Sequence, residues 1–412
     1  MSATGTLDAM VVGGGPVGAC VAALLARAGG HGPAPRVGLL QPAAVGAASD
    51  DRVFAFSRAS ERILDAAGAW AGIRTAAWPY ERMRVWYEGV APEGEDVLQF
   101  DAAEVGEPNL GYIIPAQRVT GALLDSFRES GGQAISGELQ GMSVAGADGL
   151  VRIHSTAGEW AAQLIVGADG ARSAVRGACG IEARTASYGQ TAIVARLIPA
   201  ASHQNTAWQR FLPGGTLALL PLADGSVSLV WSLPEAQARA LLAATPADFE
   251  ARLLQDSDAA LGRLALAGAR SGFALQRLTT DRYCAAHCAL VGDAAHVVHP
   301  LAGQGVNLGL LDAAALAQLC LQARASGEHL GAQRTLRAYE RWRKGENQLM
   351  EFAIDAFNSV LAQGAGPVSA LARRALVLTN RSALLKRFFI GQALGRPPDL
   401  TAWESDRVSP RR

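Results

Sequence analysis

Residues 290–307 of this 412-residue chain, which we call the decisive motif, read Leu290-Val-Gly-Asp-Ala-Ala-His-Val-Val-His-Pro-Leu-Ala-Gly-Gln-Gly-Val-Asn307. It predicts a buried strand ending at Gly292-Asp293, a glycine-rich turn, and a helix that begins near Val306. The first turn of a helix presents unpaired N–H groups and the positive end of the helix dipole. An acid, a glycine turn and such a helix suit a flavin, whose reduced ring is negative around N1 and O2. The alternative is an ordinary strand–turn–helix with conformational glycines.

A second glycine-rich turn lies near the N-terminus. Asp8–Val12 predicts a short apolar strand, Gly13-Gly-Gly-Pro-Val-Gly18 follows it, and a helix is expected through Ala22–Arg27. This is the G-x-G-x-x-G pattern in the strand–turn–helix setting that dinucleotide binding requires. The first glycine makes the turn, the second lets the backbone reach a pyrophosphate, and the third lets the helix pack on the strand. A glycine-rich packing turn is the alternative.

The second predicted strand, Arg36–Leu40, departs from the usual dinucleotide-binding pattern. Gln41 follows it, at the position where an Asp or Glu commonly binds the adenosine ribose. A glutamine offers one uncharged acceptor oxygen, so we expect weaker adenosine binding and not a lost site. Arg52, eleven residues farther on, is a candidate for contact with a phosphate or the ribose. A solvated surface arginine is the alternative.

Composition excludes several classes of function. The chain holds 37 basic and 37 acidic residues with no basic run, which argues against a nucleic-acid partner. We find no apolar stretch of about 18 residues and no signal-peptide pattern, so neither a spanning helix nor a leader is predicted. The five cysteines predict free thiols in a reducing cytosol. Cys284 and Cys288 flank His287 without a second ligand pair, so no metal site is predicted.

The two glycine turns are separated by β-rich segments, which predicts an α/β protein with a discontinuous Rossmann-like FAD-binding domain. We assign residues 1–78, 111–185 and 275–345 to that domain. Residues 79–110 and 186–274 are predicted to form a β-sheet substrate domain, and 346–412 a helical C-terminal region. A helical stretch is expected over Glu235–Leu254 and helical structure over 335–395. Ligand sites commonly lie at such a domain interface.

Several segments coincide with one known family. The superfamily segments are Gly13–Gly18, Asp51-Arg-Val-Phe-Ala-Phe-Ser57, Gly111-Tyr-Ile-Ile-Pro-Ala-Gln-Arg118, Gly167-Ala-Asp-Gly170 and Gly292–Asn307; those of the quinone branch are Thr206–Leu212, Leu219–Leu222, Val230–Ser232 and Asp355–Asn358. Over nearly its whole length the chain resembles the flavin-dependent aromatic hydroxylases of ubiquinone biosynthesis. These are the UbiH/UbiF/VisC/COQ6 group, relatives of para-hydroxybenzoate hydroxylase. The departure at Gln41 puts adenosine contacts in doubt and leaves the fold expectation intact.

The resemblance implies a role for each matching residue. On the cofactor side, Gly13, Gly15 and Gly18 approach the FAD pyrophosphate, and Gln41 and Arg52 lie near the adenosine or the phosphates. Gln117 and Arg118 lie along the ribityl–pyrophosphate stretch, and Asp169 is shared between FAD and nicotinamide recognition. The ribityl and phosphate contacts include Gly292, Asp293 and Asn307. Pro300, Gly303, Gln304 and Gly305 are implied to line the flavin ring as the catalytic set. His296 and His299 are weaker candidates as bases, because a histidine there can simply cap or pack. A turn residue is the alternative for Asp169, and a surface amide for Gln117.

The implied activity is that of an FAD-dependent monooxygenase that hydroxylates the ring of a polyprenylated phenol or quinol through a flavin C4a-hydroperoxide. NAD(P)H is expected as a transient reductant, because no second Rossmann motif is present. A flavin oxidoreductase without oxygen insertion and a non-catalytic subunit of a quinone-biosynthesis assembly are the alternatives. We expect a cytoplasmic protein. Partner proteins, a homo-oligomer and peripheral contact with the inner membrane through Lys386–Ile390 stay open, the alternative for that segment being a helix packed on the domain.

Overall fold

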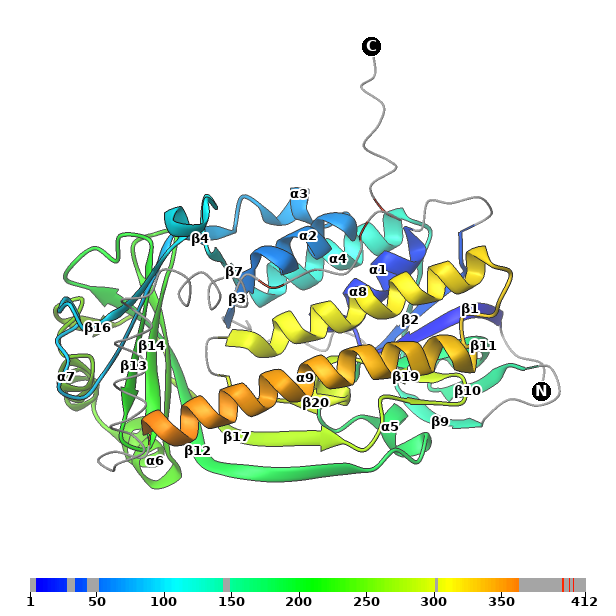
Figure 1. The fold of residues 1–412 in the computed structure, drawn as a ribbon. Helices are drawn as coiled ribbons and strands as arrows, with labels where there is room; N and C mark the ends of the chain where they lie inside the picture. The colour runs from blue at the N-terminus through cyan, green and yellow to red at the C-terminus, as the bar shows by residue number, and fades with distance from the viewer. Residues whose placement is uncertain are drawn as a thin grey trace, which may run out of the picture.

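The computed structural model describes residues 5–27, 34–42, 52–143, 149–300 and 303–362, together with Gly395, Leu400 and Trp403. Two large sheets lie at opposite ends of an elongated body, with helices running along its length (Figure 1). A small third sheet joins β3 (Val53–Ser57), β7 (Gly111–Pro115) and β4 (Trp78–Tyr80) in that order. The chain thus mixes helices with both parallel and antiparallel strands.

The first sheet contains the N-terminal motif and is largely parallel. Its strand order is β18 (Cys284–Ala285), β19 (Cys288–Leu290), β11 (Gly158–Gly167), β1 (Gly5–Val12), β2 (Val37–Gln41) and β8 (Gln133–Ser136), with β10 (Val151–Ser155) and β9 (Leu139–Ser143) continuing from β11. Strands β19, β11, β1, β2 and β8 pair in parallel. Their carboxyl ends therefore lie at one edge of the sheet, where open α/β sheets bind ligands.

Helices pack along this sheet and against one another. They are α1 (Pro16–Ala26), α2 (Arg58–Ala66), α3 (Trp70–Ile73), α4 (Ala116–Glu129), α5 (Ala174–Ala178), α8 (Gln304–Ala325) and α9 (Gln333–Ala362). Of two short 3-10 turns, η2 (Gly292–Ala294) contacts α8, and η1 (Ala102–Val105) contacts β6 (Leu98–Asp101) of the second sheet. Every residue of α1 from Gly18 to Ala26 is buried, because its alanines, glycine and cysteine let it lie closely between the sheet, α4 and α8. The largest apolar core of the described residues forms around these contacts.

Helix α8 corrects one expectation from the sequence. It has 22 residues and is long and apolar enough to cross a membrane by length and composition, although we expected no such stretch. However, 67% of its most apolar window is buried inside the protein, against α1, α2 and α9. A core helix passes the same test of length and composition, and the packing identifies α8 as one.

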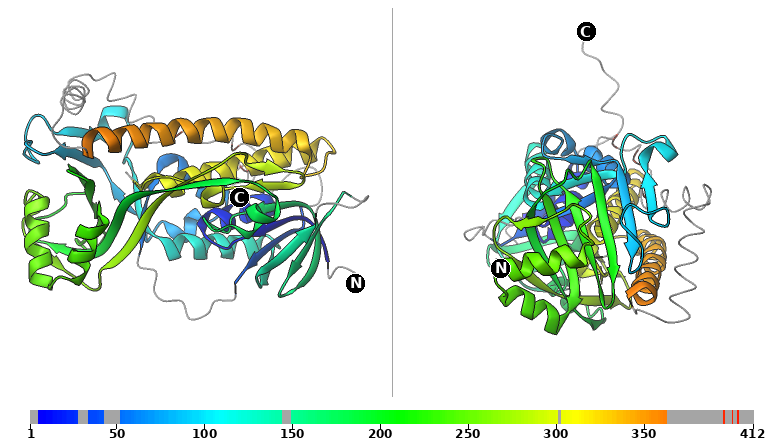
Figure 2. Two further views of the ribbon diagram at one scale, coloured as in Figure 1. Left: turned by 90° about the horizontal axis from the view of Figure 1, so that it is seen from below. Right: turned by 90° about the vertical axis from the view of Figure 1, so that its left-hand side faces the viewer.

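The second sheet is mostly antiparallel and has its own core around Trp86, Trp231 and Phe249. Its strand order is β20 (His296–Val297), β17 (Ser271–Thr280), β12 (Ala183–Pro199), β15 (Val227–Pro234), β14 (Gly215–Pro221), β13 (Thr206–Leu212), β5 (Arg82–Tyr87) and β6 (Leu98–Asp101), with β16 (Leu264–Leu266) beside β12. Strands β12 and β17, of 17 and 10 residues, form a long ribbon that runs back toward the first sheet (Figure 2).

The helical stretch predicted over Glu235–Leu254 is present as two helices, α6 (Glu235–Ala243) and α7 (Pro246–Asp256). Pro246 cannot donate a helical hydrogen bond but suits the first position of a helix, and the Thr245 hydroxyl caps the new helix by accepting from Asp248 N. Helix α9 matches the predicted C-terminal helicity up to residue 362, and the remainder, including Lys386–Ile390, lies outside the described residues. The ribbon crosses the boundaries we assigned near 185 and 275, and the division into domains stays a prediction.

Candidate cofactor and active site

The two glycine turns meet at the carboxyl edge of the first sheet. Val12 pairs with Gly167 across β1 and β11, and Gly167 pairs with Leu290 across β11 and β19. The ladder continues past the strand ends, since Ala168 N donates to Val12 O at 2.8 Å and Val291 N donates to Gly167 O at 3.0 Å. Three predicted site segments that are far apart in sequence therefore lie side by side.

The glycines of the N-terminal turn divide into packing positions and one open position. Gly13 has φ +111°, and a Cβ there would lie 2.3 Å from Ala168 O; a Cβ on Gly18 would lie 2.0 Å from Gly13 O. A Cβ on Gly15 would meet no described atom within 4 Å. Gly15 is the N-cap of α1 and provides no side-chain acceptor, so the helix N–H groups remain open to a ligand. The cradle fits a pyrophosphate.

Gln41 ends β2 beside this turn. A Cβ built on Gly14 would lie 1.8 Å from Gln41 Oε1, which places the amide oxygen directly against the glycine backbone. The side chain is partly exposed. Gln41 therefore lies where a ribose ligand is expected, and its contact with adenosine stays a prediction.

Asp293 and Arg52 lie together at the second turn. The Asp293 side chain is exposed, yet the protein mass around it raises its pKa by burial, against the opposing effects of His296 and Arg52. The Arg52 guanidinium lies over the Phe54 ring at 5.9 Å and over the Phe273 ring of β17 at 5.7 Å. The structure thus joins the predicted FAD segments to the ribbon of the second sheet.

The remaining ring-facing residues begin α8. Gly303 has φ +65° and is its N-cap, without a side-chain acceptor. A Cβ on Gly305 would meet no described atom within 4 Å. Pro300 and Gln304 are half-buried on either side of this turn, while residues 301 and 302 are not described. The open backbone and the positive helix end fit the negative edge of a reduced flavin.

Three of the predicted site residues make contacts that hold parts of the protein together. Asn307 is buried; its Nδ2 donates to Ala55 O and Gly303 O, and its Oδ1 accepts from Ser57 N and Ser60 Oγ, so it ties α8 to β3 and α2. Asp169 accepts from Ser173 Oγ and from the backbone N–H groups of residues 174 and 175, which fixes the start of α5. Gly292 has φ +55° and packs against Val17. Their direct contacts with a cofactor stay predictions.

Gln117 and Arg118 lie at the start of α4, next to the strand that carries Arg52. Both are exposed in the first turn of α4. Ala116 N donates to Arg52 O at 2.9 Å, which fixes the start of this helix next to the strand that carries Arg52. Their assignment to the ribityl–pyrophosphate stretch stays a prediction.

Sequence reasoning missed a buried polar network behind the second turn. Asp312 of α8 is fully buried and accepts from four donors: Gly292 N at 3.1 Å, His296 Nε2 at 2.6 Å, Arg343 Nε at 2.8 Å and Asn347 Nδ2 at 3.0 Å. Burial acts to raise the pKa of Asp312, but His296 and Arg343 outweigh it and hold it at about 2. A lone carboxylate in an otherwise apolar helix was the available sequence signal, because a buried charge needs partners.

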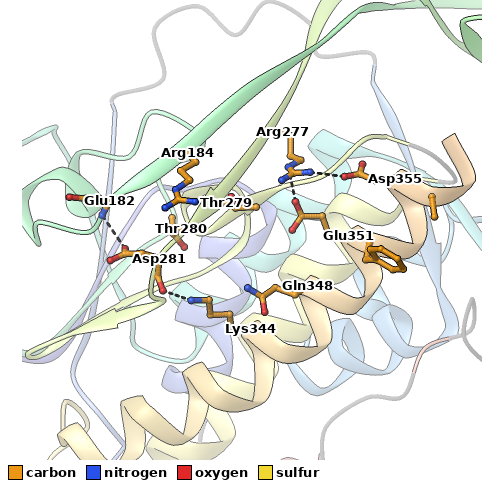
Figure 3. Close-up of a pocket in the computed structure, with 12 residues that line it drawn as sticks. Glu182, Arg184, Arg277, Thr279, Thr280, Asp281, Lys344, Gln348, Glu351 and Asp355 are labelled. Atoms are coloured by element: carbon orange, nitrogen blue, oxygen red, sulfur yellow. Dashed lines mark hydrogen bonds and ion pairs between the residues drawn. The ribbon is translucent and has the colours of Figure 1, made fainter. Parts of the chain in front are cut away.

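A separate groove of about 690 Å³ lies between the β12–β17 ribbon and α9 (Figure 3). None of the residues predicted to bind the cofactor lines it. Arg277 pairs with two carboxylates of α9, lying 3.0 Å from Glu351 Oε1 and 2.9 Å from Asp355 Oδ2, and Lys344 donates to the backbone oxygen of Asp281. These contacts join α9 to the ribbon.

Comparison with known proteins gives consistent matches. A family model described as an FAD binding domain matches residues 6–351. Ubiquinone hydroxylase UbiL of Rhodospirillum rubrum is 34% identical, covering 96% of this chain and 91% of its own, and 3-demethoxyubiquinol 3-hydroxylase of Escherichia coli is 33% identical, covering 93% and 97%. The mitochondrial ubiquinone biosynthesis monooxygenase COQ6 of Mus musculus is 31% identical, covering 93% and 90%.

Solved structures show the same fold. PqsL of Pseudomonas aeruginosa, described as a probable FAD-dependent monooxygenase, superposes with a TM-score of 0.76 at 24% identity, covering 90% of this chain and 99% of its own. The p-nitrophenol 4-monooxygenase PnpA of Pseudomonas putida gives a TM-score of 0.75 at 18% identity, covering 95% and 98%. The predicted α/β FAD-binding fold is confirmed.

Proposed function

This chain belongs to the FAD-dependent monooxygenase family, and we propose that it hydroxylates the aromatic ring of a polyprenylated phenol in ubiquinone biosynthesis. One observation carries the proposal. The decisive motif leaves the first sheet at β19 and enters the second as β20, where Leu278 pairs with Val297 and Thr279 with His296. His299 and Pro300 follow directly after this pairing, so a ring bound beside them at the start of α8 would lie between the two sheets.

Different residues of the site would hold different parts of the cofactor. The open backbone at Gly15 and the start of α1 would hold the pyrophosphate, and the Asp293 carboxylate would accept hydrogen bonds from cofactor hydroxyls. The Gly303–Gly305 turn and the start of α8 would stabilise negative charge on the ring. Bound FAD, once reduced by NAD(P)H, supplies the activation of O₂. The second sheet would cover the ring and exclude water from the reaction.

The substrate assignment is supported by the relatives. Two of them are named for ubiquinone and demethoxyubiquinol hydroxylation, and the chain matches both over more than nine-tenths of its length. Because a polyprenyl chain is strongly apolar, we place the reaction in the cytoplasm at the surface of the inner membrane. A homo-oligomer and quinone-biosynthesis partner proteins belong to the same proposal.

Two measurements test the proposal against its alternatives. Purified protein should be yellow with bound flavin and should consume O₂ with NAD(P)H only when a prenylated phenol is present, giving a product heavier by one oxygen atom. A flavin oxidoreductase without oxygen insertion would give no such product, and a non-catalytic subunit would hold no flavin. Deleting the gene should then make a quinone precursor lacking one ring hydroxyl accumulate.

A further inference from the structure

His299 lies at the step from the second sheet into the ring-facing turn, directly before Pro300. Its side chain is 1% exposed. Its Nε2 lies 2.9 Å from Gln190 Oε1, and its ring stands edge-on to the Tyr188 ring, with centroids 5.0 Å apart. Both partners belong to the part of β12 where the pairing register with β17 shifts, between Ser187 and Thr191. The second sheet therefore fixes the imidazole beside the turn.

The hydrogen bonds around Gln190 decide which imidazole nitrogen carries the hydrogen. Gln190 Nε2 donates to Gly214 O at 2.8 Å, so the amide oxygen is the atom that faces His299. An amide oxygen only accepts, so the His299 Nε2 must be the donor. Burial lowers the pKa of His299 to about 4 against the opposing effect of Asp355, so the ring is neutral near pH 7. A neutral ring holds one hydrogen, and Nδ1 is consequently a lone-pair acceptor.

The Nδ1 atom is buried and has no hydrogen-bond partner among the described residues. Buried polar groups nearly always have a partner, and an unpaired one destabilises the protein. Neither nitrogen of His296, three residues earlier, is buried without a partner: its Nε2 is bonded to Asp312, and its ring stacks on Tyr283 with centroids 5.8 Å apart. Of the two candidate bases, only His299 therefore has a buried, unpaired nitrogen among the described residues.

We propose that His299 Nδ1 accepts the hydrogen bond of the substrate's phenolic hydroxyl, which makes His299 a catalytic residue for hydroxylation. This inference rests on the proposed function. A phenol donates one strong hydrogen bond, and a neutral imidazole lone pair accepts it without charge repulsion. Polarising the O–H bond toward Nδ1 increases the electron density of the ring at its ortho and para carbons, where an electrophilic oxygen adds. The hydrogen stays on the phenol in the bound complex.

Two variants at one position separate the two nitrogens. His299→Gln places an amide nitrogen near the position of Nε2, so it retains the bond to Gln190 and loses the acceptor at Nδ1. His299→Asn can place its oxygen near the position of Nδ1 and loses the bond to Gln190. His203→Gln is the matched control, because His203 is also buried but both its nitrogens bond to backbone groups, at Leu222 O and Asn205 N.

The probes are 2-prenylphenol and its methyl ether, titrated into the FAD-loaded, oxidised protein and followed by the change in flavin absorbance. Removing the partner of a buried hydroxyl should weaken phenol binding by His299→Gln about tenfold. Binding of the ether, which has no hydrogen to donate, should be unchanged. His299→Asn and His203→Gln should both retain the wild-type preference for phenol over ether.

Other outcomes overturn the inference. Unchanged phenol affinity in His299→Gln, or equal losses for phenol and ether, would show that Nδ1 does not bind the hydroxyl. Loss of FAD from His299→Gln on dialysis would assign Nδ1 to the cofactor instead. If His299→Gln does not fold, His299→Asn decides, because loss of its phenol preference contradicts the proposed acceptor. A wild-type protein that neither binds nor hydroxylates prenylphenols would contradict the proposed function itself.

Discussion

The two ends of the decisive motif differ in how completely the protein satisfies their polar groups. At the first end, Gly292 and His296 both bond to Asp312, which is held in turn by Arg343 and Asn347. At the second end, beyond residue 298, the His299 Nδ1 and the open space at Gly305 face no partner among the described residues. The first end is therefore a frame held by its own hydrogen bonds, whereas the second keeps a buried, unpaired acceptor and an uncovered glycine. Polar groups that the protein leaves without a hydrogen-bond partner indicate a ligand site better than position within a motif does.

The largest effect is expected from breaking the frame. Asp312→Ala leaves the buried Arg343 Nε and His296 Nε2 without their acceptor, while Arg343 keeps its bonds to Glu346 and Asn347. Breaking a buried ion pair from one side costs about 3–5 kcal/mol, so we expect a loss of that order in the free energy of unfolding. Urea unfolding followed by circular dichroism measures it. Asp355→Ala, which removes a partly exposed partner of Arg277, is the matched control and should cost about 1 kcal/mol or less.

The same carboxylate should respond to acid. Its folded pKa of about 2 lies below its value in the unfolded chain, so its contribution is complete above pH 4 and is lost as the pH falls toward 2. Asp312→Ala should lack this part of the acid dependence. Equal stability losses in the Asp312 and Asp355 variants would contradict the distinction between frame and surface.

Gly305→Val tests the open end. A Cβ at this position meets no described atom, so folding should change by less than about 1 kcal/mol, within the range of helix propensities. Oxygen transfer should fall about 100-fold, because the new side chain enters the space of the ring and displaces the reacting groups. Product yield is compared with circular dichroism. Gly18→Val, where a Cβ would lie 2.0 Å from Gly13 O, is the contrasting variant and should damage folding first.

Asp293 lies within the first end, between Gly292 and His296, but its side chain is exposed. Asp293→Ala should give a folded protein depleted of FAD, because charge-assisted hydrogen bonds to cofactor hydroxyls contribute about 1.5–3 kcal/mol. That corresponds to roughly a tenfold to hundredfold loss of affinity. The flavin-to-protein ratio after dialysis measures it. Full occupancy in the variant would remove Asp293 from the cofactor contacts.

The smallest effect concerns Gln41 at the N-terminal turn. If its amide oxygen accepts from the ribose, Gln41→Glu should tighten FAD binding by about 1 kcal/mol, or about fivefold, because a carboxylate accepts at both oxygens and carries charge. Hydroxylation at saturating FAD should hardly change. Titration of the apo-protein by quenching of flavin fluorescence decides it. Unchanged or weaker binding would mean that Arg52 or backbone groups hold the ribose.

Both glycine turns, their flanking strands and helices, and the family of the chain could be predicted from the sequence alone. These features are local: a strand, a glycine pattern and a helix within some twenty residues carry their own conformational preferences. The order of the elements around Gly13–Gly18 and Gly292–Asn307 could therefore be predicted. Pro246 also signals the break between α6 and α7, although the helical stretch expected from the sequence ran across it.

Which polar groups have hydrogen-bond partners, and which do not, depends on the tertiary structure. Asn307 bonds to Ser57 across 250 residues of sequence, His299 to Gln190 across 109, and Arg343 to Asp312 across 31. No local pattern predicts such pairs, because each partner is brought into reach by the packing of separate elements. His296 and His299 are equivalent in the sequence, three residues apart in one motif. They differ in the fold because a buried carboxylate from α8 pairs with one, whereas an amide from β12 pairs with the other and leaves its Nδ1 buried without a partner.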